Sequence, residues 1–302
     1  MDINFFSPRR FVFCIGAQKA GTTWLYEVLK KHPELFVPPV KELNYCTEIV
    51  EGEKWMKKYT SDDWNSKRWR RWIRNNLLEL VHQPSAAALW TLLFCLIPRN
   101  KHLISIYKLI FSRDKLNLDV SPSYASLKSE SWSMIKGSFR DSKILFILRD
   151  PIERDWSALK MNLIDHGWAS ASEFDKKDHT STLVKYSKYS DYKTTLSSVL
   201  KVYDMSNVHI CYYDELKKDP QAFLDKVCDF LSVSIIKLPS RSQNPINAGF
   251  EKVMSAEYQD LLVKKHADQI LWLSQHIGKA DGCNYVDNWI GKYGLDKDNG
   301  NI

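Results

Sequence analysis

One pattern occurs three times along this chain: a short apolar run, a turn, and then an amphipathic stretch. The apolar runs are FVFCI, ILFIL and VHICYY, at residues 11–15, 144–148 and 208–213. Helical patterns follow them at about 22–31, from Pro151 onward and at 219–231. Strands that alternate with helices pair in parallel, and helices cover both faces of the resulting sheet. The sequence therefore predicts an α/β fold with a central parallel sheet flanked by helices.

The first turn holds a glycine-rich loop, GAQKAGTTW, which runs from Gly16 to Trp24 and is called the anion loop below. Its two glycines have the G-x-x-x-x-G spacing of a phosphate-binding loop, and a helix N-terminus follows that can bind an anion. A loop for ATP carries a lysine directly after its second glycine, where this chain has Thr22 and Thr23. The lysine is Lys19, inside the loop. A tight structural turn is the alternative for the glycines alone, but the strand–loop–helix context favours an anion site that is not built for ATP.

The second turn carries an arginine and, farther on, a hydroxyl. Arg149 leaves the strand end of ILRDPIERDWS, and Ser157 lies eight residues later, about two turns into the next helix. A guanidinium and a hydroxyl together bind a phosphate well. A salt bridge from Arg149 to an aspartate and a capping or solvent-facing serine are the alternative. Because the carboxyl ends of parallel strands share one edge, we expect this pair beside the anion loop.

Five motifs of the chain resemble those of PAPS-dependent sulfotransferases in order and spacing. They are GAQKAGTTWL, PPVKELNYC, DVSPSY, ILRDPIERDWS and YYDELKKDP, between Phe11 and about Val233. The likeness is greatest to the branch of the heparan sulfate sulfotransferases and their bacterial relatives. It implies a P-loop-like fold that binds 3′-phosphoadenosine 5′-phosphosulfate (PAPS), releases 3′-phosphoadenosine 5′-phosphate (PAP) and requires no metal.

The resemblance also assigns site residues. Arg149 and Ser157 would bind the 3′-phosphate, Lys19 would stabilise the leaving phosphate oxygen, and Glu42 would be the general base. The loop residues assigned to the cofactor are Gly16, Ala17, Gln18, Lys19, Ala20, Gly21, Thr22, Thr23 and Trp24. For Glu42 the alternative is a surface pair with Lys41.

The chain departs from the family pattern in two places. Glycan-branch relatives carry a lysine before the Ser/Thr-Pro of the third motif, where this chain has Val120. Many relatives have Arg-Lys-Gly in a C-terminal phosphate loop, for which this chain offers Asn247 and Gly249. We assign these two residues to the nucleotide, with an ordinary turn before a helix as the alternative.

The acceptor side has weaker signals. The candidate residues are Lys41, Tyr45, Ser121, Tyr124, His166 and Trp69. A capping or surface role is the alternative for His166. Trp69 lies in a basic, Trp-rich stretch that either contacts the acceptor or forms an amphipathic surface helix. That stretch belongs to a helical insertion expected at about 61–118, within a single sulfotransferase domain of residues 1–302.

Charge, hydropathy and cysteine content indicate which partners and which cellular compartment to expect. A net charge of +7 favours anionic partners. The N-terminus lacks the apolar core of a signal peptide. The longest apolar run, 85–98, is shorter than the roughly 20 residues of a membrane span, and it predicts a buried helix or a membrane-surface contact. Scattered cysteines without a C-x-x-C pair indicate a reducing cytoplasm and no zinc site.

We therefore expect a cytoplasmic sulfotransferase of secondary metabolism that sulfates a hydroxyl or a nitrogen of a small molecule, with no nucleic-acid partner. A guanidinium toxin of the saxitoxin type is one candidate acceptor, and a polysaccharide or lipid is the rival within the class. A non-catalytic nucleotide- or anion-binding protein is the rival from another class. The sequence leaves the oligomeric state open.

Overall fold

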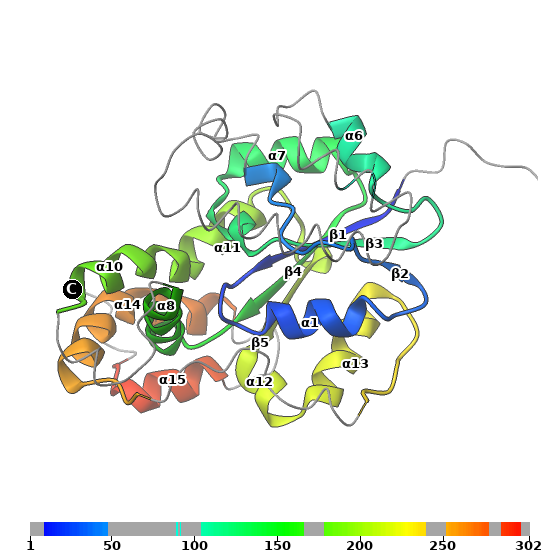
Figure 1. Ribbon diagram of the computed structural model, residues 1–302. Coiled ribbons are helices and arrows are strands. Elements are labelled where there is room, and N and C mark those ends of the chain that lie inside the picture. The colour runs from blue at the N-terminus through cyan, green and yellow to red at the C-terminus, as the bar shows by residue number, and fades with distance from the viewer. Residues whose placement is uncertain are drawn as a thin grey trace, which may run out of the picture.

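The computed structural model describes residues 9–47, 89, 91, 104–165, 178–239, 252–277 and 285–296. In this part of the chain, five strands form one sheet in the order β2-β3-β1-β4-β5, and every pairing is parallel (Figure 1). The strands are β1 (Phe11–Gly16), β2 (Leu35–Phe36), β3 (Leu116–Val120), β4 (Lys143–Leu148) and β5 (Val208–Tyr212). The predicted α/β fold with a central parallel sheet is confirmed.

Helices follow the three strands that the sequence predicted. They are α1 (Thr22–Leu29) after β1, α8 (Pro151–Asp165) after β4, and α12 (Tyr213–Lys218) and α13 (Pro220–Leu231) after β5. Pro151 opens α8 and Pro220 opens α13, where a proline costs no hydrogen bond. Asp219 caps α13, because its carboxylate accepts from the backbone N–H groups of Gln221 and Ala222.

The other helices lie on both sides of the sheet and at its carboxyl edge. They are α6 (Ile104–Leu109), α7 (Ser129–Ser138), α10 (Thr180–Ser187), α11 (Tyr192–Leu200), α14 (Ala256–His276) and α15 (Tyr285–Tyr293), with short 3-10 turns at Pro122–Ser126, Lys188–Ser190 and Met205–Asn207. Figure 1 shows α1 and α13 on one side of the sheet and α6 and α7 on the other. Helices α8, α10, α14 and α15 gather where β4 ends.

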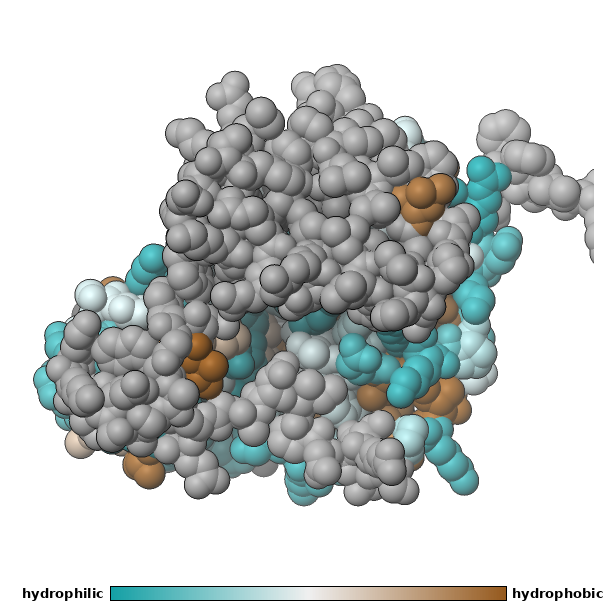
Figure 2. Space-filling model, viewed as in Figure 1, coloured by the Kyte–Doolittle hydropathy of each residue, from teal (hydrophilic) through white to brown (hydrophobic). Residues whose placement is uncertain are grey.

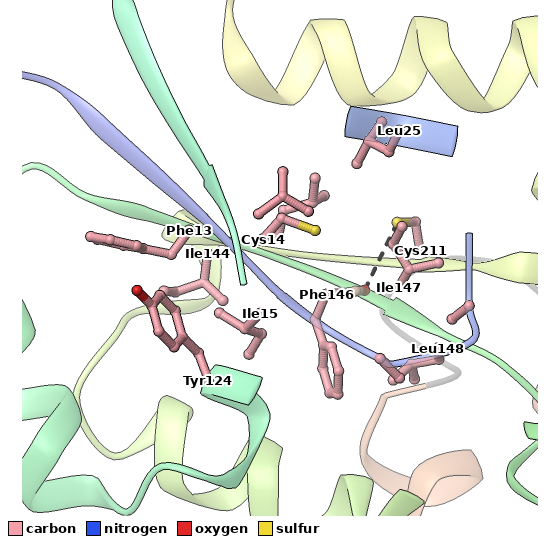
Figure 3. Packing of buried hydrophobic residues seen from close by; sticks show 14 of the residues in the cluster. Phe13, Cys14, Ile15, Leu25, Tyr124, Ile144, Phe146, Ile147, Leu148 and Cys211 are labelled. Carbon is pink, nitrogen blue, oxygen red and sulfur yellow. Dashed lines mark hydrogen bonds between the residues drawn. The ribbon is translucent and has the colours of Figure 1, made fainter. Parts of the chain in front are cut away.

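The core explains why the predicted strands are almost continuously apolar. Every residue of β1 is buried, as are the last five of β4, because helices cover both faces of the sheet. Figure 3 shows Phe13 and Ile144 near Tyr124, with Ile15 and Phe146 farther along the sheet, and the rings of Phe13 and Tyr124 lie 6.1 Å apart. The described cysteines, Cys14, Cys46, Cys211 and Cys228, are buried and reduced.

Strands β2 and β3 were not predicted from the sequence. Residues Leu116–Leu118 belong to β3, between β1 and β2, whereas the helical insertion was expected to extend to 118. Helix α6 lies within the expected insertion, and most of residues 61–103 lie outside the described part. The polar Asn117 interrupts the apolar pattern by which β3 could have been predicted from the sequence. It is fully buried, and its side-chain amide donates to the carbonyls of Arg10 and Ser112.

The described residues present few apolar side chains on the face that Figure 2 shows. In Figure 2 the described residues are mainly hydrophilic, with a small number of hydrophobic ones among them. None of the helices in the described ranges is long and apolar enough to cross a membrane.

Candidate functional site

The anion loop connects β1 to α1 and is held against β4. The backbone N–H of Ala17 donates to the carbonyl of Ile147 at 2.8 Å. Gly21 has a φ of 88° and precedes α1, whose first turn has no side-chain cap. This φ favours glycine, and a Cβ at this position would lie 2.5 Å from Cδ2 of Leu216, whose side chain would have to shift. The N-terminus of α1 has no side-chain cap, and a helix N-terminus attracts an anion.

Arg149 lies directly beside this loop. Its Nη1 donates to the carbonyl oxygen of Lys19 at 2.7 Å, and its guanidinium lies 4.7 Å from the centroid of the Tyr213 ring. Nη2 is 3.8 Å from a carboxylate oxygen of Glu153, and the buried Nε has no hydrogen-bond partner in the described residues. The structure thus brings Arg149 and the anion loop to one edge of the sheet, with donor capacity left on the guanidinium.

Asp150 and α15 support the start of α8. The Asp150 carboxylate accepts from the backbone N–H of Ile152 at 3.0 Å, from Lys292 at 2.9 Å and from the hydroxyl of Tyr293 at 2.5 Å. Arg149, the proposed phosphate ligand, directly precedes Asp150. The contacts of Asp150 to α8 and to α15 therefore also hold the backbone of Arg149. The contribution of α15 has no signal in the sequence, because the contact joins residues 142 and 143 positions apart.

Ser157 is half-buried on α8. The segment that follows the predicted C-terminal phosphate loop contacts α8 at the neighbouring residue, Trp156. The indole N–H of Trp156 donates to the carbonyl of Lys252 at 3.1 Å. Asn247 and Gly249 themselves lie outside the described residues. So do two of the predicted acceptor-side residues, His166 and Trp69.

The side chain of Lys19 extends from the loop toward α8. Its Nζ is 3.5 Å from the sulfur of Met161. Lys19 has a φ of 67°, which places it at a sharp bend of the loop. The ammonium therefore occupies the space between the anion loop and the helix that carries Ser157.

Lys41 and Glu42 lie beside the last residues of the anion loop, at the first turn of α1. The Lys41 ammonium donates to the hydroxyl of Thr23 at 2.9 Å, to that of Thr22 at 3.4 Å and to a Glu42 carboxylate oxygen at 3.1 Å. The two side chains do pair, as the surface alternative required, but Lys41 is only 16% exposed while Glu42 is 39% exposed. The pair faces the first turn of α1 instead of standing apart on the surface.

A buried carboxylate, Asp119, anchors this region. Its Oδ2 accepts from the hydroxyls of Tyr107 and Tyr124, and its Oδ1 from that of Ser121, each at 2.7 Å. Burial and the charge of Asp119 raise the pKa of Tyr107 and of Tyr124 well above the ordinary value, so both phenols stay protonated donors.

Three predicted acceptor-side residues belong to this interior network. Ser121 Oγ accepts from the backbone N–H of Asn44 at 3.2 Å, and the Tyr124 hydroxyl from that of Cys46 at 3.3 Å. The Tyr45 ring is buried and stacks on Tyr107, with centroids 4.4 Å apart. In this structure, Tyr45, Ser121 and Tyr124 are buried and hold the segment that carries Glu42, and they present no surface to an acceptor.

Within the described ranges, no group of three or more His, Cys, Asp and Glu side chains has the arrangement of a metal site. The groups that the structure places at this edge are ammonium and guanidinium cations, backbone donors and the partly exposed carboxylates of Glu42 and Glu153. That combination suits the transfer of an anionic group.

Comparison with known proteins identifies relatives of this fold. The model of the sulfotransferase family matches residues 11–236. The crystal structure of a sulfotransferase from Alicyclobacillus acidocaldarius superposes with a TM-score of 0.61 and 18% identity, over 89% of this chain and 96% of that one. The sulfotransferase domain of the Synechococcus PCC 7002 olefin synthase gives a TM-score of 0.47 and 18% identity, over 84% and 86% of the two chains. A comparison with curated protein sequences found no match.

Proposed function

The chain belongs to the sulfotransferase family, and we propose that it transfers a sulfuryl group from PAPS to a hydroxyl or nitrogen of a small-molecule natural product. One observation carries the donor assignment: Arg149 hydrogen-bonds the backbone of the anion loop, so two sites for anions adjoin at one edge of the sheet. PAPS has a phosphate at each end of its ribose, whereas ADP and ATP lack the 3′-phosphate.

In our proposal, the anion loop and Arg149 bind different ends of PAPS. The N–H groups at the start of α1 bind the 5′-phosphosulfate, and Arg149 with Ser157 binds the 3′-phosphate, aided by the segment at Asn247 and Gly249. The buried Nε of Arg149 supports this, because a buried donor without an acceptor is costly unless a ligand satisfies it. Stacking on Tyr213 holds the plane of the guanidinium, as bidentate phosphate recognition requires.

Two side chains carry the proposed chemistry. PAPS supplies an activated sulfuryl group and a leaving phosphate. Lys19 stabilises the negative charge that develops on the leaving oxygen, and Glu42 accepts the proton of the acceptor hydroxyl or amine. The accessibility of the Glu42 carboxylate supports its role, since the acceptor must reach it.

The acceptor is proposed at the level of its class. A small molecule that is basic, such as a guanidinium alkaloid of the saxitoxin type, would be attracted by the Glu42 carboxylate. A polysaccharide or a lipid is the second candidate, and for it the basic Trp-rich stretch around Trp69 would be the binding surface.

Thermal unfolding of the full chain with PAP or ADP tests the donor site. We expect PAP to raise Tm far more than ADP does, because each charge-assisted contact to the 3′-phosphate contributes about 1.5–3 kcal/mol, or about tenfold or more in affinity. Ser157→Ala and Arg149→Met should reduce this preference. Equal shifts with PAP and ADP in the unaltered protein would overturn the 3′-phosphate assignment.

Incubation with PAPS and a panel of metabolites, followed by mass spectrometry for addition of SO₃, tests the reaction. We expect a sulfated product that disappears in Glu42→Gln, while PAP binding persists. The non-catalytic alternative predicts PAP binding in both proteins and no sulfated product from any acceptor class.

A further inference from the structure

Lys41 is held inside the site by several contacts that the expected reaction does not use. Its ammonium lies between the hydroxyls of Thr22 and Thr23, at the start of α1, and the carboxylate of Glu42. The side chain is mostly buried, with 16% of its surface exposed. A lysine that served only to solvate the surface would extend its ammonium into water.

The backbone that directs Lys41 inward adopts an unfavourable conformation. Glu42 has a φ of 62° and Asn44 a φ of 55°, a region that residues other than glycine seldom occupy. Such a conformation persists only where surrounding contacts determine it, and it often occurs at functional sites. Here the N–H of Glu42 donates to the carbonyl of Val120 at 3.2 Å, and that of Asn44 to Ser121 Oγ. The Asp119 network therefore fixes the direction in which Lys41 leaves the chain.

The hydroxyl of Thr23 links Lys41 to the anion loop. A threonine hydroxyl has one proton to donate, and its oxygen already accepts from the Lys41 ammonium at 2.9 Å. The proton is then free to point elsewhere, toward an anion at the N-terminus of α1, and the neighbouring ammonium makes it a stronger donor. Lys41 thus acts on the anion site both directly by its charge and through this hydroxyl.

The charge of Lys41 is also felt in the sheet. Burial raises the pKa of Cys14, in β1, to about 12, and the positive charge of Lys41 opposes that rise. Its one ionic partner among the described residues is Glu42, on the side from which an acceptor would approach. A sulfuryl group bound between α1 and Glu42 would bring a second negative charge next to that carboxylate. Lys41 is the cation positioned between the two.

We propose that Lys41 binds the sulfuryl oxygens of PAPS and screens them from the carboxylate of Glu42; this inference rests on the proposed donor. Lys19 and Lys41 then bind different parts of the donor, Lys19 at the leaving oxygen and Lys41 at the sulfuryl end. Lys41 is accordingly a ligand of the donor. From the sequence alone, it was expected among the residues that contact the acceptor.

Binding of PAP and PAPS to the full chain distinguishes these roles, because the two nucleotides differ only in the sulfuryl group. The dissociation constants are measured by calorimetry for the unaltered protein, Lys41→Met, Lys41→Gln and Lys41→Arg. Lys31→Met is the matched control, since Lys31 follows α1 and is exposed. No acceptor is needed for this measurement.

We expect Lys41→Met and Lys41→Gln to weaken PAPS binding at least tenfold more than PAP binding. Lys41→Arg should keep most of the PAPS affinity, and Lys31→Met should change neither. An equal loss for PAP and PAPS, or no loss in either variant that folds, would overturn the inference while leaving the donor assignment intact. If the unaltered protein bound neither nucleotide, the proposed donor would fail and this inference with it.

Discussion

The substitution Asp155→Asn tests a buried ionic network that holds α8 behind the proposed phosphate site. The Asp155 carboxylate is fully buried and accepts from Arg154 Nε at 3.0 Å, from Arg154 Nη2 at 2.5 Å and from Ser190 Oγ at 2.5 Å. Its other oxygen lies 2.7 Å from Nε2 of His266, on α14. This one carboxylate therefore joins α8 to α14 and to the turn before α11.

The expected loss follows from what the substitution leaves behind. Arg154 is also fully buried, and Asp155 is its counter-ion in the described part of the chain. Removing one partner of a buried ion pair costs about 3–5 kcal/mol. With an unfolding entropy of about 2.1 cal/mol/K for each of 302 residues, that loss corresponds to a fall in Tm of about 5–8 °C.

The same network predicts how the effect depends on pH. Burial alone would raise the pKa of Asp155, but the hydrogen bond from His266 and the charge of Arg154 outweigh it, and the pKa is lowered. A carboxylate whose folded pKa lies below its unfolded value of about 3.9 stabilises the fold above that pH. The contribution is lost as the pH falls through the folded pKa. The difference in Tm between the unaltered protein and Asp155→Asn should therefore shrink in acid.

Calorimetry or circular dichroism of the full chain, at pH 7 and at a series of acidic values, measures both effects. Asp268→Asn is the matched control, because Asp268 lies on α14, the helix that Asp155 contacts, but pairs with Lys193 at the surface, where the two side chains are 84% and 40% exposed. A surface pair contributes about 0–1 kcal/mol, so its loss should lower Tm by less than about 2 °C. The reasoning would be refuted by an Asp155→Asn variant that melts with the control at pH 7, or by a difference that widens in acid.

Three further substitutions probe the site. Tyr124→Phe and Tyr107→Phe each remove one hydroxyl from Asp119, but only the first also leaves the buried N–H of Cys46 unpaired. Tyr124→Phe should therefore lower the free energy of unfolding by about 1–3 kcal/mol more in urea titrations, and equal losses would contradict this. Gly21→Ala would place a methyl group 2.5 Å from Leu216 at a φ of 88°, so the thermal shift caused by PAP should be lost, and an unchanged shift would count against the anion loop.

Much of the sheet could be predicted because its signals are local. The strands β1, β4 and β5 are apolar runs buried on both faces, and each precedes a helix with a readable start. Strand β3 was missed because LNLDV contains Asn117 and Asp119. Their burial depends on partners at positions such as Arg10, Tyr107 and Tyr124, which hydropathy does not register.

The site, too, has features that could be predicted from local sequence signals and features that could not. That Arg149 lies beside the anion loop follows from parallel topology, which brings successive strand ends to one edge. The inward direction of Lys41 does not follow, because it depends on two positive φ angles at non-glycine residues and on hydroxyls 18 and 19 positions earlier. For the same reason Ser121 and Tyr124 were expected near the acceptor, although Asp119 holds both in the interior.

This chain has Val120 where the family resemblance predicts a lysine, and the position of Lys41 offers a physical explanation for that difference. Val120 is almost fully buried at the end of β3, and its carbonyl accepts the N–H of Glu42. The position at which the family resemblance led us to expect a lysine thus contacts the residue that follows Lys41. The ammonium of Lys41 reaches the first turn of α1 directly, at the hydroxyls of Thr22 and Thr23. We infer that this chain keeps two lysines at the transferred group, and that it draws the second from the segment that also supplies the base.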